Sequence, residues 1–272
     1  MMPRKRLGRT DIEISTLGLG TVKLGRNQSL KYPQPFELPD DQQVRDLFAC
    51  ARDFGINFLD TAPAYGYSEE RIGDLLKKER KDWVISTKVG EEFTPDKFSD
   101  EGQSWFDYSA KHTRLSVERS LRRLRTDYLD LVLVHSNGDD VGILTKTPVI
   151  QTLYQLKQEG WIRAVGISTK TLEGSLLAVD VCDAVMLVHN ANYPDEEPAI
   201  AKSMQQDVAV LLKKVLGSGH ICHDAHPAED PIQAALDFAY AHPGVTSAIL
   251  GTVNLQHLRV NLIKALRAQK LA

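Results

Sequence analysis

The feature that most constrains the fold is a regular alternation of short apolar segments with amphipathic ones. Eight strand–helix pairs follow one another at intervals of about thirty residues, and the apolar segments are rich in β-branched residues. Strands of this kind are buried on both faces, which indicates a parallel sheet covered by helices. Eight such units in roughly 250 residues predict an α/β fold, a closed (β/α)8 TIM barrel. A doubly wound open sheet is the alternative, but no predicted strand runs into the GxGxxG turn of a dinucleotide fold.

The expected elements follow from the spacing of apolar residues and from turn residues. Residues 5–15 alternate around a Gly-Arg turn and predict an N-terminal β-hairpin that closes the bottom of the barrel. Strands are expected at residues 17–20, 56–59, 82–87, 128–134, 162–168, 184–189, 208–212 and 246–250. Helices are expected at residues 41–54, 68–78, 109–124, 149–158, 172–180, 196–205, 230–241 and 255–268, and polar loops at 25–40, 90–108 and 217–227. Because no linker or low-complexity segment interrupts this order, residues 1–272 are interpreted as one barrel domain.

Composition excludes several classes of function. The 272 residues are 42% hydrophobic with a formal net charge of −3, so no basic field favours nucleic acid. No segment approaches the roughly 18 apolar residues that a membrane span needs. The basic N-terminus has no apolar run behind it, which argues against a secretory signal. Three scattered cysteines (Cys50, Cys182 and Cys222) form no disulfide framework, so we expect a soluble protein in the reducing cytoplasm.

Three consecutive predicted strands end in ionisable groups, and a tyrosine follows the first of them. Asp60, Lys88 and His135 stand at the strand ends, and Tyr65 lies in the turn after Asp60. Taken singly, each has an ordinary explanation, such as a helix cap, a solvated lysine or a packed aromatic ring. In a parallel barrel, however, the carboxyl ends of the strands meet at one mouth. The four side chains are therefore predicted to share one site.

Together these side chains suit the reduction of a carbonyl group. A phenol has an ordinary pKa of about 10, so we expect the Lys88 ammonium to lower the pKa of Tyr65. Asp60 can hold Lys88 in its charged form. His135 can bind a substrate carbonyl oxygen while the Tyr65 hydroxyl donates a proton to the developing negative charge. None of the four can supply a hydride, which implies a nicotinamide cofactor.

Five segments of the chain resemble, in order, the aldo-keto reductase family: GINFLDTAPAYGYSE, ISTKVG, YLDLVLVHS, GWIRAVGIS and ILGTVNLQHLRVN. They extend over nearly the whole chain, and the DTAxxYGxSE pattern in the first is specific. The resemblance implies a (β/α)8 barrel that binds NADP(H) in extended form and reduces small carbonyl compounds. By matching positions, it implies Tyr65 as the general acid, with Asp60, Lys88 and His135 completing a tetrad.

The resemblance also implies cofactor contacts, with some departures. Ser168 matches a serine near the nicotinamide carboxamide, but the Asn that usually follows it is Thr169, and the usual Gln on the sixth strand is Met186. Leu216 to Gly219 match the loop that approaches the pyrophosphate, where the small residues Gly217, Ser218 and Gly219 let backbone N–H groups come close to the phosphates. The region matching the adenosine 2′-phosphate site contains Gly251, Thr252, His257 and Asn261. Gly251 and His257 stand where many relatives carry Lys and Arg, with Arg259 also available. NADP(H) is the first choice, and NAD(H) is the alternative because loss of a fixed cation weakens charge-assisted binding of a phosphate.

The walls of the substrate pocket are expected from the loop after the third strand. This loop carries Trp105, Phe106 and Tyr108, and Val22 stands where relatives often have an aromatic residue. Members of the family with narrow specificity often have a long C-terminal loop over the pocket, and none follows the last predicted helix. We therefore expect an open site that accepts aldehydes better than bulky ketones. Physiological substrate, reaction direction and oligomeric state are not predicted.

Three other interpretations remain open from the residues alone. Lys88 could be a Schiff-base nucleophile in a barrel aldolase, although ion pairing with Asp60 argues against it. The segment HICHDAH contains His220, Cys222, His223 and His226 and could bind a metal ion, although no second ligand cluster matches it. A barrel of this kind could also sense a nucleotide as a regulatory subunit, with little turnover.

Overall fold

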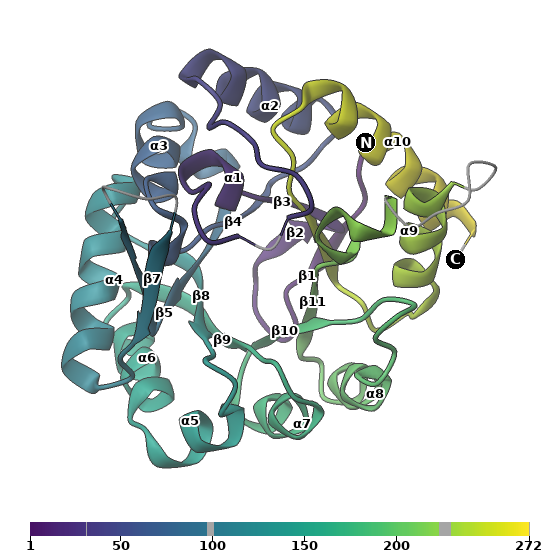
Figure 1. Ribbon diagram of the computed structural model, residues 1–272. Coiled ribbons are helices and arrows are strands. Elements are labelled where there is room, and N and C mark those ends of the chain that lie inside the picture. Colours follow the sequence, from purple (N-terminus) through teal and green to yellow (C-terminus); the bar gives the residue numbers. More distant parts are fainter. Residues whose placement is uncertain (31, 97–100, 223–229, 272) are drawn as a thin grey trace.

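Eight parallel strands close into a barrel in the computed structural model, which describes the chain except for residues 31, 97–100, 223–229 and 272 (Figure 1). In barrel order from the first, the strands are β3 (Leu17–Gly20), β4 (Phe58–Asp60), β5 (Val84–Val89), β8 (Leu129–His135), β9 (Ile162–Ser168), β10 (Ala184–Val188), β11 (Ala209–Lys213) and β12 (Ser247–Leu250). Pairing of β12 with β3 closes the ring. The predicted TIM barrel is confirmed, and the open sheet is excluded.

Helices surround this barrel in a ring (Figure 1). The main ones are α2 (Asp41–Asp53), α3 (Ser68–Leu75), α4 (Ala110–Leu124), α6 (Val149–Gln158), α7 (Leu172–Val181), α8 (Glu197–Gln205), α9 (Pro231–Ala241) and α10 (Leu255–Leu271). Several begin at a side chain that accepts a backbone N–H: Asp40 and Gln43 form a capping box on α2, and Ser109 caps α4. Such caps satisfy the first amides of each helix and explain why the predicted starts agree with the structure to within a residue or two.

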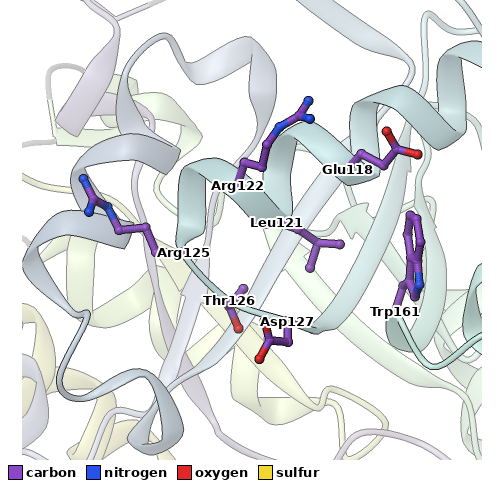
Figure 2. A pocket seen from close by; sticks show the side chains of 7 residues that line it. All are labelled: Glu118, Leu121, Arg122, Arg125, Thr126, Asp127 and Trp161. Carbon is purple, nitrogen blue, oxygen red and sulfur yellow. The ribbon is translucent and has the colours of Figure 1, made fainter.

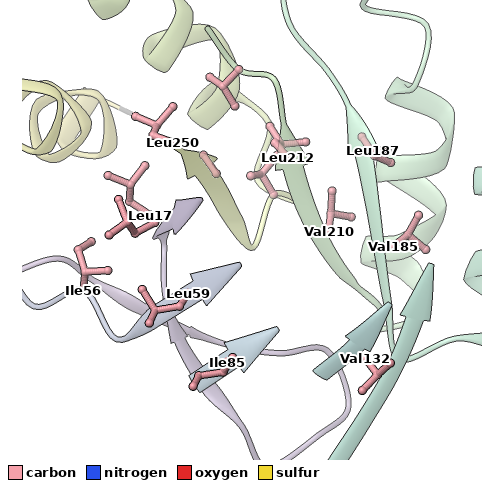
Figure 3. Close-up of a cluster of buried hydrophobic side chains, with 14 of the residues drawn as sticks. Leu17, Ile56, Leu59, Ile85, Val132, Val185, Leu187, Val210, Leu212 and Leu250 are labelled. Atoms are coloured by element: carbon pink, nitrogen blue, oxygen red, sulfur yellow. The ribbon is translucent and has the colours of Figure 1, made fainter. Parts of the chain in front are cut away.

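Alternate residues of the strands pack into two separate apolar layers. On β10, Val185 and Leu187 contact the layer between the barrel and its helices, part of which Figure 3 shows. Met186, between them in sequence, points into the barrel interior together with Leu211 of β11 and Phe58 of β4. Because both faces of each strand are buried, the strand sequences are continuously apolar rather than alternating.

The predicted N-terminal hairpin is present, formed by β1 (Arg4–Arg6) and β2 (Glu13–Ser15). Its turn at Gly8 packs against the amino-terminal ends of β10 and β11. A Cβ atom on Gly8 would lie 2.7 Å from the carbonyl oxygen of Asp207 and 2.9 Å from that of Asp183, at a backbone φ of +54°. Only glycine fits this close approach, which seats the hairpin at the bottom of the barrel.

The predicted polar loop at residues 90–108 is wrong in one respect, because it contains a second hairpin. Strands β6 (Glu91–Pro95) and β7 (Gly102–Phe106) pair in antiparallel fashion beyond the carboxyl end of β5. The local sequence favours strands weakly, since two glutamates open β6 and a proline ends it. Tertiary contact stabilises the hairpin instead, with the Arg26 guanidinium stacked 3.5 Å from the centre of the Phe93 ring.

Shorter elements complete the fold. They are α1 (Val22–Gly25), α5 (Asp140–Lys146), and the 3-10 turns η1 (Pro63–Tyr65), η2 (Arg80–Asp82) and η3 (Gly217–Cys222). Neither α1 nor α5 was predicted, and η3 lies in the polar loop expected at residues 217–227. Within the part of the chain that the structure describes, no helix is both long and apolar enough to span a membrane.

Candidate active site

A buried ion pair joins the second and third strands of the barrel. The Lys88 ammonium, on β5, donates to Asp60 Oδ1 of β4 at 2.7 Å and to the Thr61 carbonyl oxygen at 2.8 Å. The side chains of Lys88 and Asp60 are only 2% and 6% exposed. A buried charge is tolerable when it is paired and hydrogen-bonded, so each of these groups requires the other. The expected role of Asp60, holding Lys88, matches this geometry.

Tyr65 and His135 adjoin this pair. The Lys88 Nζ atom lies 4.7 Å from the centre of the Tyr65 ring, and the rings of Tyr65 and His135 meet edge to face at 6.3 Å between centroids. Tyr65 comes from η1, which directly follows β4, and His135 is the last residue of β8. The fold thus brings together all four residues that the sequence placed at one mouth.

The electrostatic setting of Tyr65 differs from the expectation. Burial raises its pKa well above the ordinary value of a phenol, and the nearby Asp60 and Glu91 carboxylates add to this effect, while Arg26 opposes it. The Lys88 charge does not prevail because the ammonium is paired with Asp60. Tyr65 is therefore a neutral phenol with its proton in place.

Glu91 is a neighbour of the tetrad that the sequence analysis missed. Its Oε2 atom lies 2.7 Å from Nδ1 of His135, off the line of a ring N–H bond. Burial raises the pKa of Glu91, but His135, Ser104 and Arg26 together outweigh burial and the pKa falls to about 2. Burial lowers the pKa of His135, and the carboxylate of Glu91 only partly offsets this. At neutral pH the pair is therefore a carboxylate beside a neutral imidazole.

Arg26 is a second residue without a sequence signal, since it lies in an expected loop. Its Nη1 donates to the Ala64 carbonyl oxygen at 3.0 Å, beside Tyr65 in η1. Its guanidinium also stacks on Phe93 of β6. Arg26 thereby ties the turn that carries Tyr65 to the strand that carries Glu91.

The residues predicted to bind the nicotinamide begin on β9, the strand next to the one that ends in His135. Ser168 ends β9 and pairs in register with His135. Its Oγ accepts a hydrogen bond of 2.8 Å from Lys213 Nζ, which also donates to the Thr169 carbonyl oxygen at 2.6 Å. The Thr169 hydroxyl is 2.7 Å from Ser175 Oγ on α7. Lys213 was not anticipated, and it brings a donor to this side.

The predicted pyrophosphate loop forms a left-handed turn. Gly217, Ser218 and Gly219 have φ values of +53°, +58° and +91°, and Leu216, just before them, packs partly buried against the core. The small residues of this turn would let a phosphate come close to the backbone. Two of the amides, those of Gly217 and Gly219, already donate to carbonyl oxygens of the same turn.

The residues predicted near an adenosine phosphate lie around the start of α10. Gly251 and His257 are exposed, and the Thr252 hydroxyl accepts from the Asn254 amide at 3.1 Å. Asn261 differs, because its side chain is buried and its Oδ1 has no partner among the described residues. The structure thus brings Gly251, Thr252 and His257 to the surface and places Asn261 beneath it.

The four predicted pocket residues divide between two faces. Val22 begins α1, next to the mouth. Phe106 pairs with Glu91, and Tyr108 donates from its hydroxyl to the His135 carbonyl oxygen at 3.0 Å, so both border the tetrad. Trp105 instead pairs with Glu92 on the other face of the hairpin and stacks on His112 of α4 at 5.3 Å.

A surface hollow of about 610 Å³ lies far from these residues (Figure 2). Its lining includes Thr126 and Asp127, just before β8, and Trp161, just before β9. These positions lie at the amino-terminal ends of the strands, opposite the mouth. The hollow therefore takes no part in the site.

The geometry gives little support to the two alternative interpretations, a Schiff-base lysine and a metal site. Lys88 is 1% exposed and paired with a carboxylate, which favours a charged amine rather than a nucleophile. For the proposed metal site, His223 and His226 lie outside the described residues. Elsewhere in the described chain, no group of three histidine, cysteine, aspartate or glutamate side chains could hold a metal ion.

Comparison with known proteins places this site in a family. Residues 16–222 match the Aldo/keto reductase family. A solved candidate aldo-keto reductase from Pseudomonas aeruginosa superposes with a TM-score of 0.85 at 46% identity, covering 97% of this chain and 94% of that one.

Two curated relatives agree with this assignment. An uncharacterised oxidoreductase, YqkF of Bacillus subtilis, is 27% identical over 99% of this chain and 93% of its own length. L-Galactose dehydrogenase of Arabidopsis thaliana is 30% identical over 88% of this chain and 74% of its own. None of these relatives favours a regulatory subunit without turnover. The chain belongs to the aldo-keto reductase family.

Proposed function

We propose that the protein reduces aldehydes and ketones to alcohols with a nicotinamide cofactor, and that Tyr65 donates the proton. The observation that carries this proposal is a neutral, partly buried phenol beside the Asp60–Lys88 ion pair and His135. A neutral phenol holds the proton that a carbonyl oxygen needs as it gains negative charge. The family assignment supports carbonyl reduction in general terms.

The described residues fit a nicotinamide dinucleotide. Lys213 and Ser168 present polar hydrogen atoms at the mouth, and the small residues of the left-handed turn at residues 217–219 leave room for a phosphate near the backbone. When bound, the cofactor would supply the hydride that no side chain can provide. NADP(H) is the preferred form, with His257 and the exposed Arg259 as the nearest basic side chains in sequence to Thr252. NAD(H) is the alternative.

Each tetrad residue then has a separate task. The Tyr65 O–H bond breaks as its proton passes to the carbonyl oxygen, and the Lys88 ammonium lies close enough to stabilise the phenolate that remains. Asp60 keeps Lys88 charged and in position. A neutral His135 whose Nδ1 faces a carboxylate carries its proton on Nδ1, which leaves Nε2 as an acceptor. Donation from Nε2 to a substrate oxygen therefore requires the imidazolium form.

Phe106, Tyr108 and Val22 are proposed to contact the substrate, since they border the tetrad. Trp105 is the weakest member of the predicted set because it faces α4. Small aldehydes remain the expected substrate class. A cytoplasmic location also remains a prediction, resting on the free, buried cysteines Cys50 and Cys182.

Replacement of Tyr65 by phenylalanine tests the proposal directly. We expect kcat for reduction of 4-nitrobenzaldehyde with NADPH to fall by about 10²- to 10⁴-fold, because the proton donor is lost. Binding of NADPH, followed by fluorescence titration, should persist. Tyr67→Phe is a matched control, because Tyr67 lies two residues further on and is 67% exposed. An unchanged rate in Tyr65→Phe would exclude Tyr65 as the donor, and cofactor binding without any turnover in the unmodified chain would favour the nucleotide-sensing alternative.

A further inference from the structure

A second lysine reaches the mouth of the barrel and has no part in the proposed chemistry. Lys213 is the last residue of β11. It lies two residues after Leu211, which points into the barrel interior, so both side chains are on the same face of the strand. Its Nζ contacts Ser168 Oγ at 2.8 Å and the Thr169 carbonyl oxygen at 2.6 Å. Ser168 stands in register with His135, so Lys213 and the tetrad share one end of the barrel.

The acceptors of Lys213 are both uncharged. No carboxylate of the described residues lies within ion-pair distance of its Nζ atom. Burial and, to a smaller extent, the positive charges of Lys214, Lys88 and Lys170 lower the pKa of Lys213 to about 7, while Asp140 opposes them. The charge of Lys213 in turn lowers the pKa values of Glu196 and His135. The amine is therefore poised between its two protonation states near neutral pH.

Two positions near Lys213 offer little to a nicotinamide carboxamide. The substrate carbonyl group, held by Tyr65 and His135, accepts the hydride directly from the nicotinamide ring. The ring must therefore lie at this same end of the barrel. On the intervening strand β10, Met186 has only a thioether. The Thr169 hydroxyl is engaged with Ser175. Lys213 and Ser168 form a polar pair on this side of the mouth, whereas the Asn190 amide donates to the Lys214 carbonyl oxygen at 3.1 Å.

We propose that Lys213, with Ser168, binds the nicotinamide carboxamide and that the charge of Lys213 makes the site discriminate between reduced and oxidised cofactor. The inference rests on the proposed function, because it needs a nicotinamide at this mouth. The oxidised ring carries a positive charge that the reduced ring lacks, so an adjacent ammonium repels only the oxidised form. Because the proton on Lys213 weakens binding of the oxidised form, binding of the oxidised form must weaken binding of that proton by the same factor. A proton is then released from Lys213.

The sign of the pH dependence follows. Below pH 7 Lys213 is mostly an ammonium, and affinity for the oxidised cofactor falls by up to about tenfold for each pH unit. Above pH 7 the amine is neutral and the affinity recovers. The reduced cofactor shows no such trend. Ionisation of the cofactor phosphates is common to both forms and cancels in their comparison.

Isothermal titration calorimetry of the full chain at pH 7 tests this inference. Titrations with NADP⁺ and with NADPH, in buffers of different ionisation enthalpy, give the number of protons released by each. We expect NADP⁺ to release about half a proton more than NADPH, because Lys213 is about half protonated there. Lys213→Met should abolish the difference, and Lys213→Arg should abolish it while weakening NADP⁺ binding at every pH. Lys214→Gln, next along the chain, should retain it.

The outcomes separate the two proposals. If both nucleotides bind but release equal numbers of protons, the role of Lys213 is wrong and the proposed function stands. If the difference survives in Lys213→Met, another group releases the proton and the inference is again wrong. If neither nucleotide binds the unmodified chain, the proposed function fails and this inference fails with it. Circular dichroism spectra of the variants establish that each is folded.

Discussion

Two sides of one barrel mouth each hold a lysine, and the two lysines have opposite surroundings. On the side formed by β4 and β5, Lys88 is almost fully buried and donates to the Asp60 carboxylate and to a backbone carbonyl oxygen. On the side formed by β9 and β11, Lys213 donates to a hydroxyl and to a backbone carbonyl oxygen. The difference between the two sites is one carboxylate.

That single group decides what each lysine can do. A carboxylate at 2.7 Å holds Lys88 in an ion pair, which places its charge beside Tyr65. Without such a partner, burial brings the pKa of Lys213 to about 7. A fixed charge suits the stabilisation of a phenolate, whereas a titrating charge suits a response to the state of a ligand. Two lysines on one barrel can therefore serve catalysis and binding separately.

The largest expected effect is a difference in stability between the same substitution at the two sites. Lys88→Met leaves the buried Asp60 carboxylate unpaired and should lower the free energy of unfolding by about 3–5 kcal/mol. Lys213→Met leaves no buried charge unpaired and should lower the free energy of unfolding by about 1 kcal/mol. Urea unfolding at neutral pH measures both values.

A double variant serves as the control for this comparison. Asp60→Asn combined with Lys88→Met removes both charges, and it should recover much of the loss seen in Lys88→Met alone. If Lys88→Met and Lys213→Met lowered the free energy of unfolding equally, the Asp60 carboxylate would not distinguish the two sites.

A smaller effect is expected from giving Lys213 a carboxylate of its own. Ser168→Asp places an acid where Ser168 Oγ now lies 2.8 Å from Lys213 Nζ. An opposite charge at this range shifts a pKa by about 1–3 units, so the pKa of Lys213 should rise from about 7 toward that of an ordinary lysine. NMR titration of the lysine side-chain nitrogen measures it. Ser168→Asn keeps the size without the charge and should not produce this rise; equal values in the two variants would contradict the explanation.

The fold could be predicted because its signal is repeated along the chain. On β10, Val185 packs outside the barrel and Met186 inside, so the strand has to be apolar throughout. The same pattern recurs in the other strands, and errors in single boundaries do not change the count. The hairpin at β6 and β7 escaped prediction because no local pattern marks it; it depends on the contact of Arg26 with Phe93, which are far apart in sequence.

The site was predictable on one side only. Asp60, Lys88 and His135 each end a strand in the predicted order, so topology alone brings them together. Lys213 was missed because the predicted seventh strand ended at residue 212, one residue short. Glu91 lies in an expected loop, and its contact with His135 has no sequence signature. The raised pKa of Tyr65 also depends on burial, which spacing does not reveal.

The smallest expected effect concerns His135, which lies between the two lysines and responds to both. Glu91 raises the pKa of His135, although burial keeps it below its ordinary value. Glu91→Gln removes that carboxylate, so the pKa of His135, measured by NMR titration of its ring nitrogens, should fall by about 1 unit. Because the imidazolium is the form that can donate from Nε2, the activity lost as pH rises should be lost at a lower pH. Glu92→Gln is the matched control, since Glu92 contacts His112 and Arg119 on the other face of the hairpin. If the two variants gave the same pKa for His135, the charge of Glu91 would have no special access to the tetrad.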